Sequence, residues 1–61
     1  MTAKEVVKKL TAAGFVEVSQ KGSHRKFKNA GGRMTLVPMH SGDMALATLR
    51  AIEKQTGVRL R

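Results

Sequence analysis

The chain contains no cysteine, and this absence constrains its fold more than any other feature of the sequence. Disulfide bridges and thiolate metal sites often stabilise very small domains, and neither can form here. A chain of 61 residues buries only about 60% of the surface that it exposes when unfolded. We therefore expect residues 1–61 to form one domain around one small apolar core, with no room for a cofactor-binding domain.

The first helix is expected over residues 3–13. Thr2 and Glu5 have the spacing of a capping box, in which the threonine hydroxyl accepts from an early N–H and the glutamate reaches back to the residue before the helix. Apolar side chains then recur at helical spacing as far as Gly14, which can adopt the left-handed conformation that commonly ends a helix. These signals predict an amphipathic helix with one face on the core.

Three short strands are expected next, over residues 15–20, 23–28 and 33–37. The segments between them contain glycine, as the turns of antiparallel hairpins often do. Pro38 should end the third strand or place it at an edge, because proline cannot donate to a ladder of hydrogen bonds. Consecutive short strands of this kind predict an antiparallel meander.

A second helix is expected after the third strand, with Gly57 at its end. Its start is open, since Ser41 or Asp43 could cap a long helix and Thr48 could cap a shorter one. Two amphipathic helices can cover only one face of a three-stranded sheet. The expected fold class is therefore α+β in the order α-β-β-β-α, with both helices on one face of the antiparallel sheet and the other face open to solvent.

Positive charge is concentrated in the middle of the chain. Twelve Lys and Arg residues stand against four Asp and Glu residues, which gives a formal net charge of +8 at pH 7. No carboxylate occurs between Val18 and Gly42. The basic residues in that interval are Lys21, Arg25, Lys26, Lys28 and Arg33. A concentrated positive field favours a polyanion, so nucleic acid is the first candidate partner and an acidic protein is the second.

Membrane association is not expected. The N-terminal segment lacks the apolar core of a signal peptide, and no run of apolar residues has the length of a membrane span. The basic segment also carries little apolar bulk, which an interfacial membrane segment would need. We expect a soluble cytoplasmic protein.

The second strand should place His24 on the open face of the sheet. Side chains alternate along a strand, and Phe27 is the only bulky apolar residue of this one, so it should face the helices together with Arg25. His24, Lys26 and Lys28 then share the opposite face. An imidazole can act as a general base near neutral pH, and ammonium groups can stabilise charge on a phosphorane. This set suits metal-free cleavage of RNA, whose 2′-hydroxyl is an internal nucleophile, although His24 could also be a simple phosphate contact.

Other side chains are candidates for contact with RNA. Lys26 and Lys28 are predicted to hold the scissile phosphate, and Lys21 and Arg33 to make outer phosphate contacts. The remaining candidates are Gly22, Ser23 and Arg25, next to His24 in the sequence. His40 could supply a general acid or could be a loop residue near the second helix. No metal site is expected, because two histidines with no carboxylate between them do not match a ligand pattern.

Five short segments, in order along nearly the whole chain, carry a family resemblance. They are TAKEVVKKL at 2–10, AGF at 13–15, QKGSH at 20–24, VPMH at 37–40 and TLRAI at 48–52. Together these segments resemble the HicA toxins of bacterial HicAB toxin–antitoxin pairs. The QKGSH segment would be a weak signal alone, and its combination with the VPMH and TLRAI segments makes the resemblance specific.

The resemblance implies a fold and a function. HicA toxins have a double-stranded-RNA-binding-like fold of α-β-β-β-α order and act as ribosome-independent mRNA interferases. The histidine of the Gly-Ser-His motif, here His24, is their catalytic residue, and a HicB antitoxin binds the toxin and blocks that site. By resemblance, residues 1–61 are expected to form a HicA-like toxin domain, a metal-independent endoribonuclease without a cofactor, with mRNA and a HicB-type antitoxin as its partners.

Two other readings of the sequence remain open. The charge and the open face suit a non-catalytic RNA-binding module equally well, and only His24 and the family resemblance argue against it. A third possibility is an interaction protein whose basic face docks an acidic partner. Cleavage of RNA in the presence of EDTA would distinguish the nuclease from the module, and negligible RNA affinity at low salt would favour the interaction protein.

Overall fold

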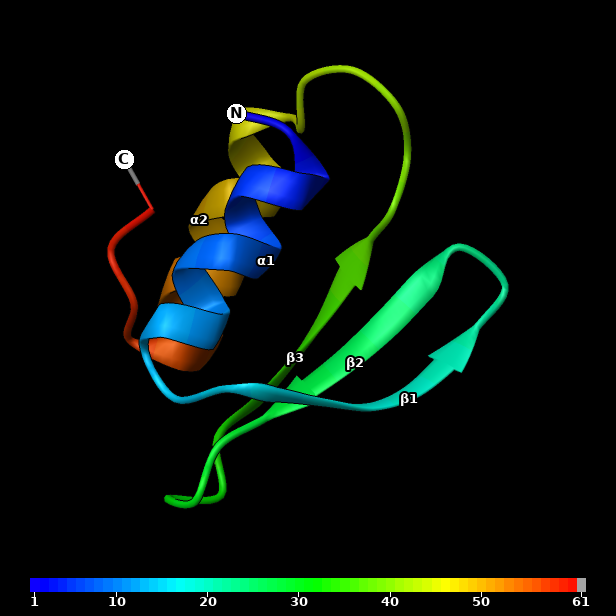
Figure 1. Cartoon of the computed structure of the whole chain (residues 1–61). Coiled ribbons are helices and arrows are strands. Elements are labelled where there is room, and N and C mark those ends of the chain that lie inside the picture. Colours follow the sequence, from blue (N-terminus) through cyan, green and yellow to red (C-terminus); the bar gives the residue numbers. More distant parts are fainter. Residues whose placement is uncertain (61) are drawn as a thin grey trace.

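The computed structural model describes residues 1–60 of the chain. The elements in order are α1 (Ala3–Ala12), β1 (Val16–Lys21), β2 (His24–Lys28), β3 (Met34–Pro38) and α2 (Leu46–Thr56). The strands form one antiparallel sheet in the order β1-β2-β3, and both helices lie on one side of it (Figure 1). This architecture confirms the predicted α+β fold of α-β-β-β-α order.

The capping box at the start of α1 is present, as the sequence predicts. The backbone N–H of Glu5 donates to Thr2 Oγ1 at 3.3 Å, and the backbone N–H of Thr2 donates to Glu5 Oε1 at 2.8 Å. The N–H of Thr2 holds the pKa of the Glu5 carboxyl below its ordinary value. Because the folded-state pKa is lowered, the stability from this contact is full above the ordinary glutamate pKa and is lost as the pH falls through the lowered value.

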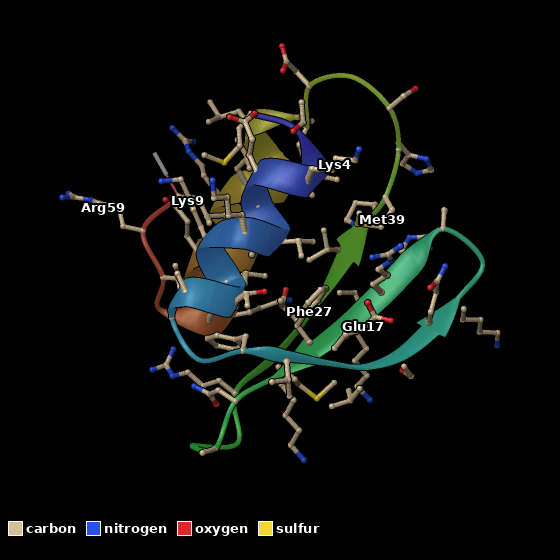
Figure 2. The ribbon with its side chains drawn as sticks, viewed as in Figure 1. Lys4, Lys9, Glu17, Phe27, Met39 and Arg59 are labelled. Atoms are coloured by element: carbon tan, nitrogen blue, oxygen red, sulfur yellow. The ribbon has the colours of Figure 1, made fainter. Side chains whose placement is uncertain are left out.

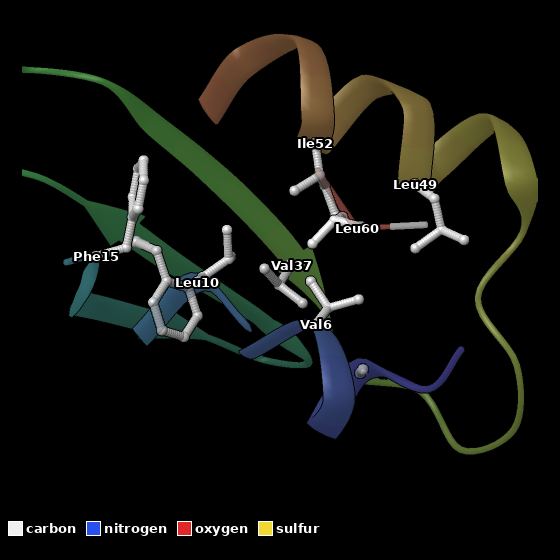
Figure 3. Close-up of a cluster of buried hydrophobic side chains, with 9 residues drawn as sticks. Val6, Leu10, Phe15, Val37, Leu49, Ile52 and Leu60 are labelled. Carbon is white, nitrogen blue, oxygen red and sulfur yellow. The ribbon is translucent and has the colours of Figure 1, made fainter. Parts of the chain in front are cut away.

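One apolar core lies between the helices and the sheet. Its buried members are Ala3, Val6, Leu10, Phe15, Phe27, Val37, Leu49, Ile52 and Leu60 (Figure 3). Phe27 projects from β2 toward the helices (Figure 2) and is 2% exposed. The face of β2 that carries Phe27 is therefore the face on the core. The segment after α2 also belongs to the core, because Leu60 is 1% exposed and its N–H donates to Glu53 Oε2 at 2.8 Å. The segment after α2 therefore inserts Leu60 fully into the core.

The start of α2 differs from every start that the sequence suggested. The N-cap residue is Ala45, whose side chain makes no capping hydrogen bond. Asp43 forms an isolated bridge with Thr2, and the N–H of Met44 donates to the carbonyl of Met1 at 2.7 Å. The loop before α2 is therefore anchored to the start of α1, and this tertiary contact replaces a local cap. Within residues 1–60, neither helix is long and apolar enough to span a membrane.

Gly57→Ala is expected to lower the free energy of unfolding by about 1–2 kcal/mol, because Gly57 ends α2 with a φ of 74°. A Cβ at position 57 would also lie 3.1 Å from Nη1 of Arg33, whose guanidinium must then move. Urea unfolding measures the difference. Gly31→Ala is the matched control, since the nearest atom to its Cβ would be a side-chain atom of Asn29 at 3.6 Å. Equal effects of the two substitutions would contradict the strain at Gly57.

Candidate nucleic-acid interface

The strand register determines which side chains share the face of the sheet that the helices leave uncovered. Residues directly opposite each other in an antiparallel pair lie on the same face. His24 pairs with Lys21 on one side and with Pro38 on the other, and Lys26 pairs with Ser19 and Leu36. We call this side the open face. It carries Val16, Ser19, Lys21, His24, Lys26, Lys28, Met34, Leu36 and Pro38.

Arg25 lies on the opposite face, toward the helices, as the alternation predicts. Its Cα partners are Gln20 and the buried Val37. Its Nη1 lies 3.5 Å from Glu17 Oε1, in an ion pair near the sheet border. The ionised groups of the open face are therefore all basic, because Glu17 is turned away from it. Arg25 is not brought together with His24, and its assignment as an RNA contact stays a prediction.

The turn between β1 and β2 places His24 at the first position of its strand. Lys21 and His24 are paired, so the loop between them consists of Gly22 and Ser23 alone. Gly22 has a φ of 60°, as the first central residue of a type II′ turn requires, and Ser23 has a negative φ. The amide Nε2 of Gln20 donates to the carbonyl of Gly22 at 3.3 Å. Gly22 therefore has a backbone role that brings Lys21 and His24 face to face.

A backbone hydrogen bond brings His40 to the same end of the sheet. The N–H of Met39 donates to the carbonyl of Ser23 at 2.6 Å, which continues the contact between β2 and β3 beyond Pro38. Met39 packs against the core (Figure 2), and His40 follows it as an exposed residue. The ring centroids of His24 and His40 lie 6.4 Å apart, with an angle of 84° between the ring planes. The two histidines of the chain are thus neighbours.

A shallow pocket surrounds His24 on the open face. We call it the His24 pocket, and its lining residues are Ser19, Lys21, His24, Lys26 and Leu36. Two ammonium groups and a hydroxyl thus flank the imidazole, which is itself exposed. A phosphodiester in this pocket would meet cations on both sides of the histidine, and Leu36 offers an apolar surface to a sugar or base.

Two other predicted contacts lie away from His24. Lys28 is at the far end of β2, about 13 Å along the strand by the usual rise per residue. Arg33 precedes β3 at that same end, and its guanidinium lies against Gly57 at the C-terminus of α2, where a cation is favourable. Lys28 could meet a neighbouring phosphate of a longer RNA strand on the open face, and the structure brings neither Lys28 nor Arg33 into the His24 pocket.

Four exposed apolar residues of the sheet were not anticipated by the sequence reasoning. Val16, Val18, Met34 and Leu36 are between 43% and 60% exposed. The signal for Leu36 was present, because Val37 is a core residue and its neighbour must face away from the core. No signal could place Val18, since a register shift between Glu17 and Ser19 forms an irregularity in β1 at that point.

Comparison with known protein families gives a match over most of the chain. The sequence profile of the family described as "HicA toxin of bacterial toxin-antitoxin" matches residues 3–58. The chain belongs to the HicA toxin family. This HicA chain is therefore the toxin of a bacterial toxin–antitoxin pair, and an antitoxin is its partner. A search of curated proteins finds no significant match.

Within residues 1–60, no group of three or more His, Cys, Asp or Glu side chains is arranged as a metal site. The chemistry that the HicA site offers from its own side chains is proton transfer by imidazole and charge stabilisation by ammonium groups.

Proposed function

We propose that this HicA toxin is an endoribonuclease that cleaves mRNA in the cytoplasm with His24 as the general base and without a metal ion. The observation that carries the proposal is the position of His24 on the open face, paired with Lys21 across the strands and followed on its own strand by Lys26. An exposed imidazole between two ammonium groups combines proton transfer with binding of a phosphate.

The proposed reaction uses the 2′-hydroxyl of RNA as the nucleophile. His24 removes the proton of the 2′-hydroxyl, the 2′-oxygen forms a bond to phosphorus, and the bond from phosphorus to the 5′-oxygen breaks. The departing 5′-oxygen takes up a proton, and the products are a 2′,3′-cyclic phosphate and a free 5′-hydroxyl. Lys21 and Lys26 stabilise the charge on the non-bridging oxygens, because both line the pocket around His24.

Lys28 is proposed to bind a phosphate beyond the scissile one. It lies at the far end of β2 from His24, so it would bind a neighbouring part of the same RNA strand. The guanidinium of Arg33 lies against the C-terminus of α2, and its contact with RNA stays a prediction. The apolar residues of the open face, Leu36 among them, offer surfaces for sugars and bases. A chain of nucleotides across this face would therefore contact a row of cations with apolar gaps between them.

We expect Lys26→Ala to weaken RNA binding to a similar degree for all sequences, because a lysine that contacts phosphate carries no sequence information. Its removal should reduce the slope of log affinity against log salt by about one unit. Fluorescence anisotropy with labelled RNA over a range of salt concentrations measures the slope. Lys54→Ala is the control, because Lys54 is an exposed residue of α2, away from the sheet. An unchanged slope for Lys26→Ala would remove this residue from the phosphate contacts.

A HicB-type antitoxin is proposed to inhibit the toxin by covering the open face. Membership of the HicA family supports this partner, and the exposed apolar residues of the sheet support the location. Val16, Met34 and Leu36 give a protein partner apolar area to bury on this face, close to the lysines that an acidic group could neutralise. Such a partner would exclude RNA from His24.

The test of the proposed function is incubation of the purified protein with RNA in EDTA. Cleavage that yields 2′,3′-cyclic phosphate ends supports the endoribonuclease. Intact RNA together with measurable binding would favour a non-catalytic RNA-binding module, for which the charge of the open face is equally suitable. Intact RNA without binding at low salt would favour a surface that docks an acidic protein.

A further inference from the structure

We propose that His40 is a second catalytic residue of this toxin and acts as the general acid that protonates the leaving 5′-oxygen. The inference rests on the proposed cleavage of RNA and adds a residue to it. Its starting point is the pair of imidazoles at the end of the sheet, which come from β2 and from the loop after β3.

The separation of the two rings suits a phosphodiester between them. Their centroids lie 6.4 Å apart and the rings are nearly perpendicular, so they are not stacked. A hydrogen bond from a ring nitrogen to an oxygen needs about 2.7–3.2 Å. Two rings at this distance can therefore each reach a different oxygen of one phosphodiester. Both side chains are exposed, so the substrate can enter without a rearrangement of the core.

The loop that carries His40 is anchored on both sides. Before it, the N–H of Met39 donates to the carbonyl of Ser23, which directly precedes His24. After it, Asp43 bridges to Thr2 and the N–H of Met44 donates to the carbonyl of Met1. A catalytic group is effective only when its supporting contacts hold it near the productive geometry. These backbone contacts supply that support for the pair.

The chemistry of cleavage calls for a second proton-transfer group. When the bond from phosphorus to the 5′-oxygen breaks, the departing oxygen takes the bonding electron pair and needs a proton. In an in-line displacement this oxygen lies on the side of the phosphorus opposite the 2′-oxygen, so the base that took the first proton cannot also deliver the second. His40 in its protonated form would donate its proton to the 5′-oxygen. The step ends with His24 protonated and His40 neutral, and exchange with water restores both.

Imidazole suits this task better than the lysine side chains of the His24 pocket, because proton transfer is most effective from a group that titrates near the working pH. Imidazole is the ordinary side chain that changes charge close to neutral pH, and the chain has two of them. His40 itself lines a second hollow, together with Lys4, Met39 and Ser41 among others. The nucleotide that carries the leaving oxygen can lie there, with its next phosphate near the Lys4 ammonium. Because His40 also lies next to His24, it would then stand close to the bond that is cut.

The experiment compares two substrates, ordinary RNA and RNA whose scissile 5′-oxygen is replaced by sulfur. A thiolate leaves without a proton, because thiols are far more acidic than alcohols. His40→Ala should lower the cleavage rate of ordinary RNA by about 10²–10⁴-fold. On the sulfur substrate, we expect the cleavage rate of His40→Ala to lie within about tenfold of the parental rate. Proton donation is not needed there, so only the effect of His40 on the position of the substrate is lost. His24→Ala should be impaired on both substrates, because the base is needed for either leaving group.

The outcomes distinguish a failure of the role proposed for His40 from a failure of the proposed endoribonuclease function. A parental rate for His40→Ala on ordinary RNA would overturn the role of His40 and leave the nuclease intact. An equal deficit on both substrates would show that His40 acts through structure and not as the acid. A parent protein that cleaves neither substrate would overturn the proposed function itself. His40→Gln, which keeps a polar side chain at this exposed site, is measured in parallel, and thermal unfolding of both variants checks that they are folded.

Discussion

Replacing His24 with alanine is expected to lower the rate of RNA cleavage by about 10²–10⁴-fold and to leave the fold nearly unchanged. The substitution removes the group proposed to take the proton of the 2′-hydroxyl. His24 is exposed at the start of β2, so its loss creates no cavity in the core. Lys21 and Lys26 remain in the pocket, and RNA affinity should therefore fall little.

The measurement uses single-turnover cleavage of a labelled RNA, with binding followed separately by anisotropy. His24→Gln is a second variant, because it keeps a polar side chain that cannot serve as a base near neutral pH. Lys54→Ala is the control, since Lys54 is an exposed residue of α2, away from the sheet. A purified His24→Ala protein that cuts RNA at the parental rate would exclude His24 as the catalyst.

Phe27→Ala is expected to lower the free energy of unfolding by about 3–5 kcal/mol. Phe27 is 2% exposed and is the bulky apolar residue with which β2 contacts the helices. The stability of native proteins lies near 5–15 kcal/mol, and a chain of this length is expected at the low end. The variant should therefore be partly or wholly unfolded at room temperature, which would also abolish the toxin's activity.

Urea unfolding followed by far-ultraviolet circular dichroism measures this loss, because the chain has no Trp or Tyr for fluorescence. Leu36→Ala is the control for stability. Leu36 lies on β3 on the open face and is 52% exposed, so its truncation should change the free energy of unfolding by less than about 0.5 kcal/mol. Similar losses from the two substitutions would contradict the assignment of Phe27 to the core and Leu36 to the solvent.

The element order was predictable because its signals are local. The capping box of Thr2 and Glu5 and the single bulky apolar residue of β2 can each be read from a few neighbouring residues. The start of α2 was not predictable, since Ala45 has no capping side chain and the preceding loop is held by contacts with the start of α1. Tertiary contacts of this kind leave no periodic signal in the sequence.

The same distinction applies to the site. His24 and Lys26 share a face because they alternate along one strand, which the sequence alone indicates. The proximity of His24 to His40 depends on the hydrogen bond between Met39 and Ser23, across a separation that no local pattern reveals. The sequence predicts that Lys28 holds the scissile phosphate together with Lys26. In the structure, Lys28 lies at the opposite end of β2 from His24.

The irregularity in β1 at Val18 affects how a second protein can approach the toxin. β1 lies at the border of the sheet, where unpaired N–H and C=O groups could accept a strand from another chain. A shift of register within such a strand interrupts its ladder and bends it, which makes it a poor template for extension. An inhibitor is therefore not expected to extend the sheet at β1, and toxin molecules should not polymerise edge to edge through this strand.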